Sequence, residues 1–467
     1  MSHIQTIVDN VKSRHVSARD VIAQAIEKAE QSESFHALLS LTSDRALERA
    51  NEIDARIAKG EEVGPLAGVP FVAKDNFLAF GAPTTAASRM LQDFNAPLQA
   101  TAIEKLEAAG AICIGKANLD AFAHGGSTEN SAFGPTLNAT DRTKVAGGSS
   151  GGSAVITALD VVPFALGTDT GGSIRQPASF NGVVGVKPTY GTVSRFGVVA
   201  MASSTDTIGC FTHDAKDAEL IMDVMSGRDP RDMTSLPDFF TPVASKPRQK
   251  IGLIRDFMTD DVDEDVRNRI NEYVDKLRNA GHIVDEVDLP IAKHALAMYY
   301  IIVPAEISSN LARYDGIRYG YRSNDVKTLA ELYGRSRGEG FVAENKRRIM
   351  IGSYVLSSGF FDAYYQQAQK ARTLLIQAYQ DLFKEYDALV GPVAPTPAFG
   401  LGENTDDPVK MYLADIMTVP PSLAGLPAIS VPAGVSATGL PIGVQIIGDK
   451  RSDAALLALA GSLEEAV

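Results

Sequence analysis

Cysteine is scarce in this chain: only Cys113 and Cys210 occur among its 467 residues. Both stand in apolar surroundings, and their spacing is not that of a metal-binding pair. A disulfide framework is therefore excluded as the source of stability, and no metal site is predicted. We expect two buried, reduced thiols, which is typical of a cytoplasmic protein.

The sequence also lacks an excess of basic residues and a long apolar run. Lys and Arg total 44 against 57 Asp and Glu, which gives a formal net charge of −13. Because phosphate binding depends on clustered positive charge, we do not expect the chain to hold nucleic acid by itself, although another member of an assembly could do so. No stretch approaches the roughly 18 apolar residues of a membrane-spanning helix, and the N-terminus does not resemble a signal peptide.

What is present is an ordinary globular composition in a chain long enough to bury a large core. Hydrophobic residues make up 45% of the sequence and charged residues 22%. The first 60 residues are predicted to be helical. Ser17 and Asp20 resemble a capping box, and a second periodic run begins at Ser43 and ends at Gly60.

Beyond this region, short apolar runs alternate with helical ones. Strands are predicted at residues 68–73, 111–114, 161–166, 250–254, 282–284, 428–431 and 442–447, with helices at 101–109, 153–159 and 263–279. The alternation predicts an α/β fold with a central mixed, largely parallel sheet covered by helices on both faces. Residues 290–415 are more helical, and an amphipathic run occupies residues 361–386. Strands at both ends of the chain favour a single domain spanning residues 1–467.

A Gly/Ser-rich stretch, GGSSGGSA, occupies residues 147–154. A flexible linker is disfavoured because the stretch runs directly into an apolar helix and strand. A phosphate-binding loop is disfavoured because the Lys-Ser/Thr of a Walker motif is missing. The stretch also fits Gly-x-Ser-x-Gly, which would make Ser149 the nucleophile of an α/β-hydrolase. That interpretation needs a downstream histidine, and His213, His282 and His294 are each better explained as helix-end or surface residues.

A second segment, GTDTGGSIRQP, occupies residues 167–177 and follows a predicted strand. Its glycines allow the backbone to approach a ligand closely, and four successive backbone N–H groups could point at one spot, as an oxyanion hole requires. Because Pro177 is expected to end any helix early, we interpret the segment as a turn with a serine at its tip. A structural turn alone would not explain why two Gly/Ser turns bracket one strand–helix unit. The four N–H groups belong to Thr170, Gly171, Gly172 and Ser173.

The third segment, VAKDN at residues 72–76, places Lys74 at the end of the first predicted strand. A lysine in such a position is usually a solvated charge. A buried lysine, however, loses its proton more easily and can then act as a general base. Since no histidine is suitably placed, a serine activated by lysine is the natural alternative.

Together the three segments resemble the amidase signature family, and the resemblance covers nearly the whole chain. Lys74, Ser149 and Ser173 follow the order of that family, 75 and then 24 residues apart. The resemblance implies that Ser173 attacks an amide carbonyl, that Ser149 relays the proton from a cis peptide, and that neutral Lys74 is the base. The backbone of residues 170–173 would form the oxyanion hole, and no cofactor is expected in this chain.

Within that family, further stretches resemble the A subunits of bacterial tRNA-dependent amidotransferases. They are STENSAFGP at 127–135, SSNLARYDGIRYG at 308–320 and KRRIM at 346–350. This resemblance implies that the chain hydrolyses glutamine and passes ammonia to a partner subunit, which converts Glu-tRNA(Gln), Asp-tRNA(Asn) or both to the amidated forms. The implied partners are the B and C subunits. ATP and Mg²⁺ would be bound by one of these partners, and tRNA would be contacted only indirectly. The implied location is cytoplasmic, with no membrane contact.

The same resemblance implies which residues bind glutamine. The α-carboxylate and α-amine of the substrate need partners of opposite charge. Arg348 would pair with the carboxylate through its planar fork, Asp415 with the ammonium, and Tyr299 would donate a hydrogen bond nearby. Without the resemblance, each would be an ordinary helix-face charge or a packed aromatic residue.

Two other functions remain open from the sequence. The first is a stand-alone amidase acting on small aliphatic or aryl amides, which would share the fold and the three catalytic residues. The second is a non-catalytic scaffold that has kept the fold.

Overall fold

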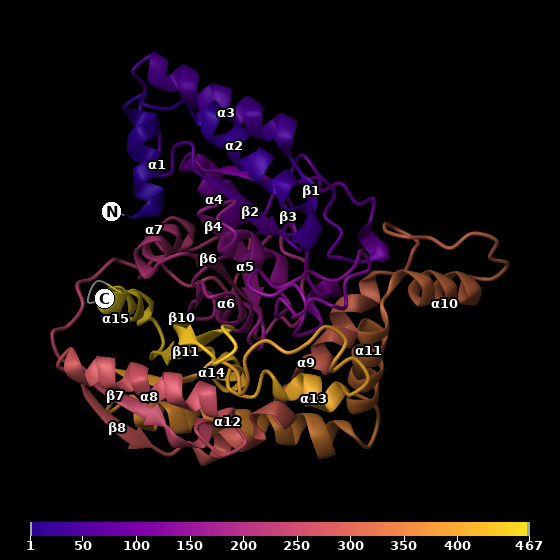
Figure 1. The fold of residues 1–467 in the computed structure, drawn as a ribbon. Coiled ribbons are helices and arrows are strands. Elements are labelled where there is room, and N and C mark those ends of the chain that lie inside the picture. The colour runs from indigo at the N-terminus through magenta and orange to yellow at the C-terminus, as the bar shows by residue number, and fades with distance from the viewer. Residues whose placement is uncertain (1, 465–467) are drawn as a thin grey trace.

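The computed structural model describes residues 2–464, and its strands form one mixed sheet (Figure 1). The strand order across this sheet is β1-β3-β2-β4-β6-β5-β10-β11-β9-β7-β8. In chain order the strands are β1 (Leu38–Leu41), β2 (Pro70–Lys74), β3 (Ile112–Ala117), β4 (Phe164–Asp169), β5 (Val184–Lys187), β6 (Thr207–Thr212), β7 (Lys250–Ile254), β8 (Ile283–Val287), β9 (Ala388–Pro392), β10 (Ala428–Val435) and β11 (Pro441–Ile447).

Parallel pairing is confined to two blocks of the sheet. β2 lies parallel between β3 and β4, and β7 lies parallel between β8 and β9. The other neighbouring pairs are antiparallel. The predicted mixed α/β fold is confirmed, but the sheet is not largely parallel. One reason is that only residues 436–440 connect β10 to β11, which is too short for the crossover that parallel neighbours need.

Helices cover both faces of the sheet, as predicted. Successive residues of β2 point to opposite faces: Phe71 and Ala73 pack in one hydrophobic cluster and Val72 in another. The first cluster includes residues of α4 and α7, and the second includes residues of α2, α3 and α5. In chain order the helices are α1 (His3–Lys12), α2 (Ala18–Gln31), α3 (Ser43–Ala58), α4 (Thr101–Ala108), α5 (Gly151–Ala158), α6 (Arg175–Asn181), α7 (Ala215–Met225), α8 (Glu264–Asn279), α9 (Ala295–Asn310), α10 (Leu329–Gly340), α11 (Ala343–Val355), α12 (Gln366–Leu382), α13 (Pro408–Leu413), α14 (Val419–Ala424) and α15 (Asp453–Glu464).

The N-terminal region contains α1, α2 and α3. α2 and α3 lie at the top of Figure 1 and pack against β3, whereas α1 packs against α7. Ser17 caps α2 by accepting a hydrogen bond from the Asp20 N–H, as its sequence pattern predicts. The expectation that all of the first 60 residues are helical is wrong for β1, which pairs antiparallel with β3. β1 has only four residues, all half-buried, so its sequence carries no alternating pattern that would reveal it.

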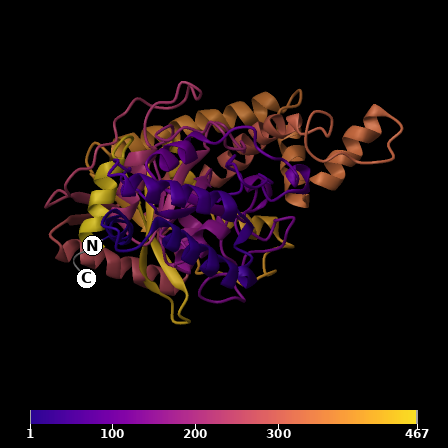
Figure 2. The same ribbon diagram turned by 90° about the horizontal axis from the view of Figure 1, so that it is seen from above.

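Residues 290–415 contain α9 to α13, as the helical composition predicts, but also the unpredicted strand β9. β9 joins the sheet between β11 and β7 and so ties this region to the rest of the fold. α10 projects from the body of the protein in both views (Figures 1 and 2).

The continuous helical run Pro290–Arg313, which includes α9, is long and apolar enough to cross a membrane by length and composition alone. The expectation that no stretch approaches the length and apolarity of a membrane-spanning helix is therefore wrong. Half of its apolar window is buried, and α9 packs against α11, α12 and α14. Burial in the protein core therefore explains its composition.

Both cysteines are free and buried, as predicted. Cys113 lies in β3, where burial raises the pKa of its thiol to about 11. Burial also raises the pKa of Cys210 in β6. Both thiols therefore stay protonated and unreactive near neutral pH.

Candidate active site

Lys74 is the last residue of β2 and is fully buried. Because β3 and β4 flank β2 in parallel, three carboxyl strand ends meet at one edge of the sheet. The Nζ atom of Lys74 lies 2.8 Å from Ser149 Oγ, 2.7 Å from Ser150 Oγ and 2.9 Å from Thr168 Oγ1. Two of the three predicted catalytic residues are therefore in hydrogen-bond contact.

The hydroxyl groups around Lys74 differ in their other partners. Ser150 Oγ donates its own proton to the Thr168 carbonyl at 3.1 Å, so toward Lys74 it acts as an acceptor. Thr168 Oγ1 also accepts, from Asn76 Nδ2 at 3.1 Å and from Lys74. A neutral amine has two N–H groups and one lone pair. With its two N–H groups directed to Ser150 and Thr168, its lone pair faces the Ser149 hydroxyl.

The surroundings of Lys74 favour this neutral form. Burial lowers the pKa of Lys74 to about 7, while the negative charges of Asp120, Asp169 and Asp206 raise it in part. A large fraction of the amine is then unprotonated near pH 7. Lys74 can act there as a general base toward Ser149.

Ser149 lies in the turn that leads into α5, and the Gly148–Ser149 peptide bond is cis. A Cβ atom on Gly148 would lie 2.2 Å from Asp120 Oδ2, so a larger residue does not fit there. The Gly148 N–H donates to Gln176 Oε1 at 2.8 Å, and the Asp120 N–H donates to the Ser149 carbonyl at 3.2 Å. Hydrogen bonds on both sides of the peptide thus hold Ser149 against Lys74.

Ser173 lies in a turn between β4 and α6 that a buried ion pair closes. Arg175 donates from Nε and Nη2 to the two oxygens of Asp169 at 3.0 and 2.9 Å, and neither side chain is exposed to solvent. Ser173 itself is 8% exposed, and its hydroxyl forms no hydrogen bond within residues 2–464. The structure therefore brings Lys74 and Ser149 into contact but has no hydrogen bond between Ser149 and Ser173.

The backbone N–H groups of residues 170–173, the predicted oxyanion hole, donate to no protein acceptor in the part of the chain that is described. A Cβ atom on Gly172 would lie 2.2 Å from Thr418 Oγ1, and one on Gly171 would lie 2.8 Å from the Tyr299 hydroxyl. Glycine is therefore needed at both positions. Unpaired N–H groups beside a serine hydroxyl provide the donors that a developing oxyanion needs.

The expectation that Pro177 ends a helix is wrong. α6 begins at Arg175 and continues through Pro177 to Asn181. Pro177 falls in the first turn of α6, where the helix does not use the backbone N–H that proline lacks. α6 ends instead at Gly182, which has a left-handed backbone conformation.

One pocket brings together two of the predicted substrate-binding residues. Arg348 of α11 and Asp415, which lies between α13 and α14, both line it beside residues 125–127. Within the described chain, Asp415 Oδ1 is buried without a hydrogen-bond partner, and a Cβ atom on Gly172 would lie 3.4 Å from it. Burial raises the pKa of Asp415 to about 8. A cationic group of a ligand would supply the missing partner and would lie next to the Ser173 turn.

Arg348 is 3% exposed and is held in a fixed position. Its Nε donates to Glu344 Oε1 at 2.7 Å, and its guanidinium lies 4.7 Å from the ring centre of Tyr300 and 5.1 Å from that of Tyr412. Its Nη1 has no acceptor among the described residues. Arg348 can therefore offer a positioned N–H group to an anion while it stays paired with Glu344.

Tyr299, the third predicted substrate-binding residue, lies in α9 and packs against Gly171. Its hydroxyl donates to no residue within 2–464. Its hydrogen bond to a ligand stays a prediction.

Asp120 is a buried residue of the site that was not predicted. It accepts hydrogen bonds from the N–H groups of Thr128 at 2.9 Å and Asn130 at 3.0 Å. Burial raises the pKa of Asp120 to about 6, and its charge acts on Lys74. Asp120 follows β3 and lies at the same edge of the sheet as Lys74. Its position after a predicted strand is the sequence feature that could have identified it as a site residue.

His124 is a second buried residue that was not predicted, and no motif marks it. Its Nδ1 lies 2.9 Å from Nδ2 of Asn345. Asn345 belongs to α11 and lies about one helical turn before Arg348. Its Nε2 is buried without a hydrogen-bond partner in the described chain. Burial and the charge of Arg348 lower the pKa of His124 to about 3, so the ring is neutral.

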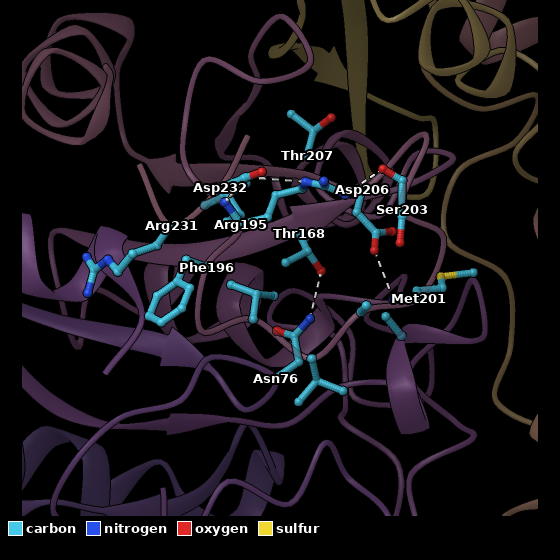
Figure 3. A pocket seen from close by; sticks show the side chains of 15 residues that line it. Asn76, Thr168, Arg195, Phe196, Met201, Ser203, Asp206, Thr207, Arg231 and Asp232 are labelled. Atoms are coloured by element: carbon cyan, nitrogen blue, oxygen red, sulfur yellow. Dashed lines mark hydrogen bonds and ion pairs between the residues drawn. The ribbon is translucent and has the colours of Figure 1, made fainter. Parts of the chain in front are cut away.

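A second pocket, of about 200 Å³, opens against Asn76 and Thr168 (Figure 3). Both side chains belong to the hydrogen-bonded group around Lys74. Asp206, which also lines this pocket, accepts from Thr170 Oγ1 at 2.8 Å. The three predicted substrate-binding residues do not line it, so it is distinct from the Arg348–Asp415 pocket.

The fold and this Lys–Ser arrangement define a class of protein. The family model described as Amidase matches residues 20–457, and the chain belongs to the amidase family. It is 48% identical over 472 residues to the A subunit of the glutamyl-tRNA(Gln) amidotransferase of Gloeobacter violaceus, with 100% of this chain and 96% of that protein covered. The corresponding protein of Koribacter versatilis is also 48% identical, over 98% of this chain and 96% of that protein.

Solved structures of related enzymes also match this chain over most of its length. The A subunit of the glutamyl-tRNA(Gln) amidotransferase of Thermotoga maritima is 38% identical, with a TM-score of 0.79 over 96% of this chain and 91% of that one. A bacterial aryl acylamidase of the amidase signature family is 29% identical, with a TM-score of 0.87 over 98% of this chain and 95% of that one.

Proposed function

We propose that this chain is the glutamine-hydrolysing A subunit of a tRNA-dependent amidotransferase. The observation that carries the proposal is the pocket in which the cationic Arg348 and the unpartnered carboxylate of Asp415 lie beside the Ser173 turn. A free amino acid with an amide side chain needs one anion-binding and one cation-binding group at such a pocket. The full-length similarity to amidotransferase A subunits supports the same assignment.

The proposed reaction starts when Ser173 Oγ attacks the side-chain amide carbon of glutamine. The proton of Ser173 passes to Ser149, whose own proton passes to the lone pair of Lys74. The N–H groups of residues 170–173 stabilise the oxyanion. The proton then returns to the leaving nitrogen, the C–N bond breaks, and ammonia leaves an acyl-enzyme on Ser173. Water hydrolyses this ester with the same base, which releases glutamate and restores the serine.

The ammonia has a use only in a larger assembly. We propose the B and C subunits as partners, one of which would bind ATP and Mg²⁺ and contact the tRNA. The net charge of −13 favours this division, because the chain has no excess of basic residues for its own phosphate contacts. The chain itself is proposed to need no cofactor and to act in the cytoplasm.

The test is glutaminase activity with and without the partner subunits. We expect slow hydrolysis by the isolated chain and a strong increase when the B and C subunits, tRNA and ATP are added. The assay measures glutamate and ammonia at saturating glutamine. No association with the partner subunits, together with rapid turnover of unrelated amides, would contradict the proposal.

A stand-alone amidase is the second candidate, which the similarity to an aryl acylamidase favours. Replacing Arg348 with alanine separates the two. If Arg348 holds the α-carboxylate, its loss removes one partner of a buried charge pair, which costs about 2–5 kcal/mol. We expect kcat/KM for glutamine to fall by roughly 30- to 4,000-fold, while turnover of propionamide, which has no carboxylate, stays close to that of the unchanged protein.

Arg335 of α10 provides the control, because its side chain is 49% exposed and it does not line the pocket of Arg348 and Asp415. Arg335→Ala is expected to change kcat/KM for neither substrate by more than about twofold. Equal losses on glutamine and propionamide in Arg348→Ala would show a structural role for Arg348 and would remove the basis for the glutamine pocket.

A further inference from the structure

Three side chains of types that can bind metal ions come together from separate parts of the chain, at the end of β4 that lies away from Ser173. His3 begins α1, Asp160 lies between α5 and β4, and His213 follows β6. The His3 Nδ1 and His213 Nε2 atoms lie 3.7 and 3.6 Å from the same oxygen, Asp160 Oδ1, and all three atoms lie within 4.8 Å of one another.

These distances are too long for hydrogen bonds, for which roughly 2.7–3.2 Å is the usual range. Within the described chain, His213 Nε2 is buried and has no hydrogen-bond partner. Zinc–ligand bonds of about 2.0–2.1 Å in a tetrahedron place neighbouring ligand atoms about 3.3–3.4 Å apart. The two separations from Asp160 Oδ1 are close to that value, and the two histidine nitrogens lie within 4.8 Å of each other, so a movement of the histidine side chains toward each other would surround an ion.

We propose that His3, Asp160 and His213 bind one divalent transition-metal ion of the Zn²⁺ class, with water as the fourth ligand. Two imidazoles and one carboxylate are a ligand set that Zn²⁺ accepts, and no thiolate is needed. Hard cations such as Mg²⁺ prefer oxygen ligands and are not expected to compete.

The neighbours of Asp160 orient it for this role. Lys28 Nζ donates to the Asp160 carbonyl at 2.8 Å and to Oδ2 at 3.2 Å, which leaves Oδ1 for the ion. The backbone of Asp160 is left-handed, with φ 52°, so a local turn sets the direction of its side chain. Such outer contacts fix ligand orientation in metal sites.

The position of the cluster makes its role structural. Phe164, the first residue of β4, pairs with Thr212, so Asp160 and His213 lie near the start of β4, while Ser173 follows its end. A six-residue strand is about 20 Å long. The ion would join α1 to neighbouring ends of β4 and β6. It would stabilise the fold without taking part in amide hydrolysis.

The experiment uses the full chain without an affinity tag, after dialysis against a chelator. We expect Zn²⁺ to raise Tm, and we expect Co²⁺ to bind once per chain with the visible absorption of a tetrahedral site. His213→Gln and His3→Gln should each lower the affinity for Co²⁺ at least tenfold and remove the Zn²⁺-dependent shift in Tm. His15, an exposed histidine after α1, provides the control: His15→Gln should keep both signals.

Two results would overturn the proposal. One is that neither metal changes Tm or binds in a 1:1 ratio to the unchanged protein. The other is that His15→Gln weakens binding as much as His213→Gln does, which would indicate unspecific histidine binding. Hydrolysis of propionamide should be the same for the chelator-treated and Zn²⁺-loaded protein. A loss of that activity on chelation would contradict the structural role.

Discussion

Replacing Ser173 with alanine is expected to lower kcat for glutamine hydrolysis by about 10⁴-fold or more, because the acyl-enzyme can no longer form. Glutamine binding should change little, since Arg348 and Asp415 stay in place. The fold should also tolerate the change, because the Ser173 hydroxyl makes no hydrogen bond to any of residues 2–464. Steady-state glutaminase assays and binding of glutamine by calorimetry measure the two quantities separately.

Ser149→Ala provides the comparison that identifies the nucleophile. It removes a proton relay, which is worth about 10²–10⁴-fold, and it leaves the attacking oxygen in place. After reaction with an acylating amide or ester, mass spectrometry should find the acyl group on Ser173 in both the unchanged protein and Ser149→Ala. An acyl group on Ser149 would reverse the two roles and would return the site to the α/β-hydrolase interpretation of residues 147–154.

The strand that carries Lys74 was predictable from the sequence, whereas several others were not. β2 and β7 are short apolar runs bounded by turn residues, and the structure has them within two residues of their predicted positions. β5 and β6 were missed because they are fully buried and therefore carry no alternating pattern of apolar and polar residues. The antiparallel centre of the sheet follows from those strands, so it could not be predicted either.

The residues of the candidate site were likewise predictable from the sequence only in part. Short motifs marked Lys74, Ser149 and Ser173, because each of them follows or precedes a regular element in a Gly-rich or strand-end turn. Glu344 and Arg348 are an i,i+4 pair within α11, but the placement of His124 beside Asn345 depends on how α11 packs over residues 121–124. Packing between segments more than 200 residues apart leaves no trace in a local pattern.

Replacing Lys74 with methionine is expected to lower kcat by about 10⁴-fold at pH 8, at the upper end of what a general base contributes. Methionine keeps the unbranched shape of the side chain but offers no lone pair for the Ser149 proton. Glutaminase assays across about pH 5.5–9 provide the measurement. The residual activity of Lys74→Met should also lose the pH dependence that the base confers.

The pH profile of the unchanged protein tests the same assignment without a mutation. Lys74 acts when neutral and its pKa is lowered to about 7, so kcat should rise as pH increases through about 7 and then level off. For kcat/KM a second group matters. Asp415 must be ionised to bind an ammonium group, and its pKa in the unliganded pocket is about 8. The kcat/KM for glutamine should therefore keep rising up to about pH 8, while that for propionamide should level off nearer 7.

Lys187 is the control that separates the catalytic from the merely buried lysine. Burial also lowers its pKa to about 7, but its Nζ donates to the carbonyl oxygens of Leu426 and Pro188, not to a serine. Lys187→Met is expected to lower Tm and to leave the pH midpoint of kcat unchanged. A midpoint that moves in Lys187→Met, or that persists in Lys74→Met, would show that Lys74 is not the base. With both outcomes as expected, the titration near pH 7 belongs to the amine that faces Ser149.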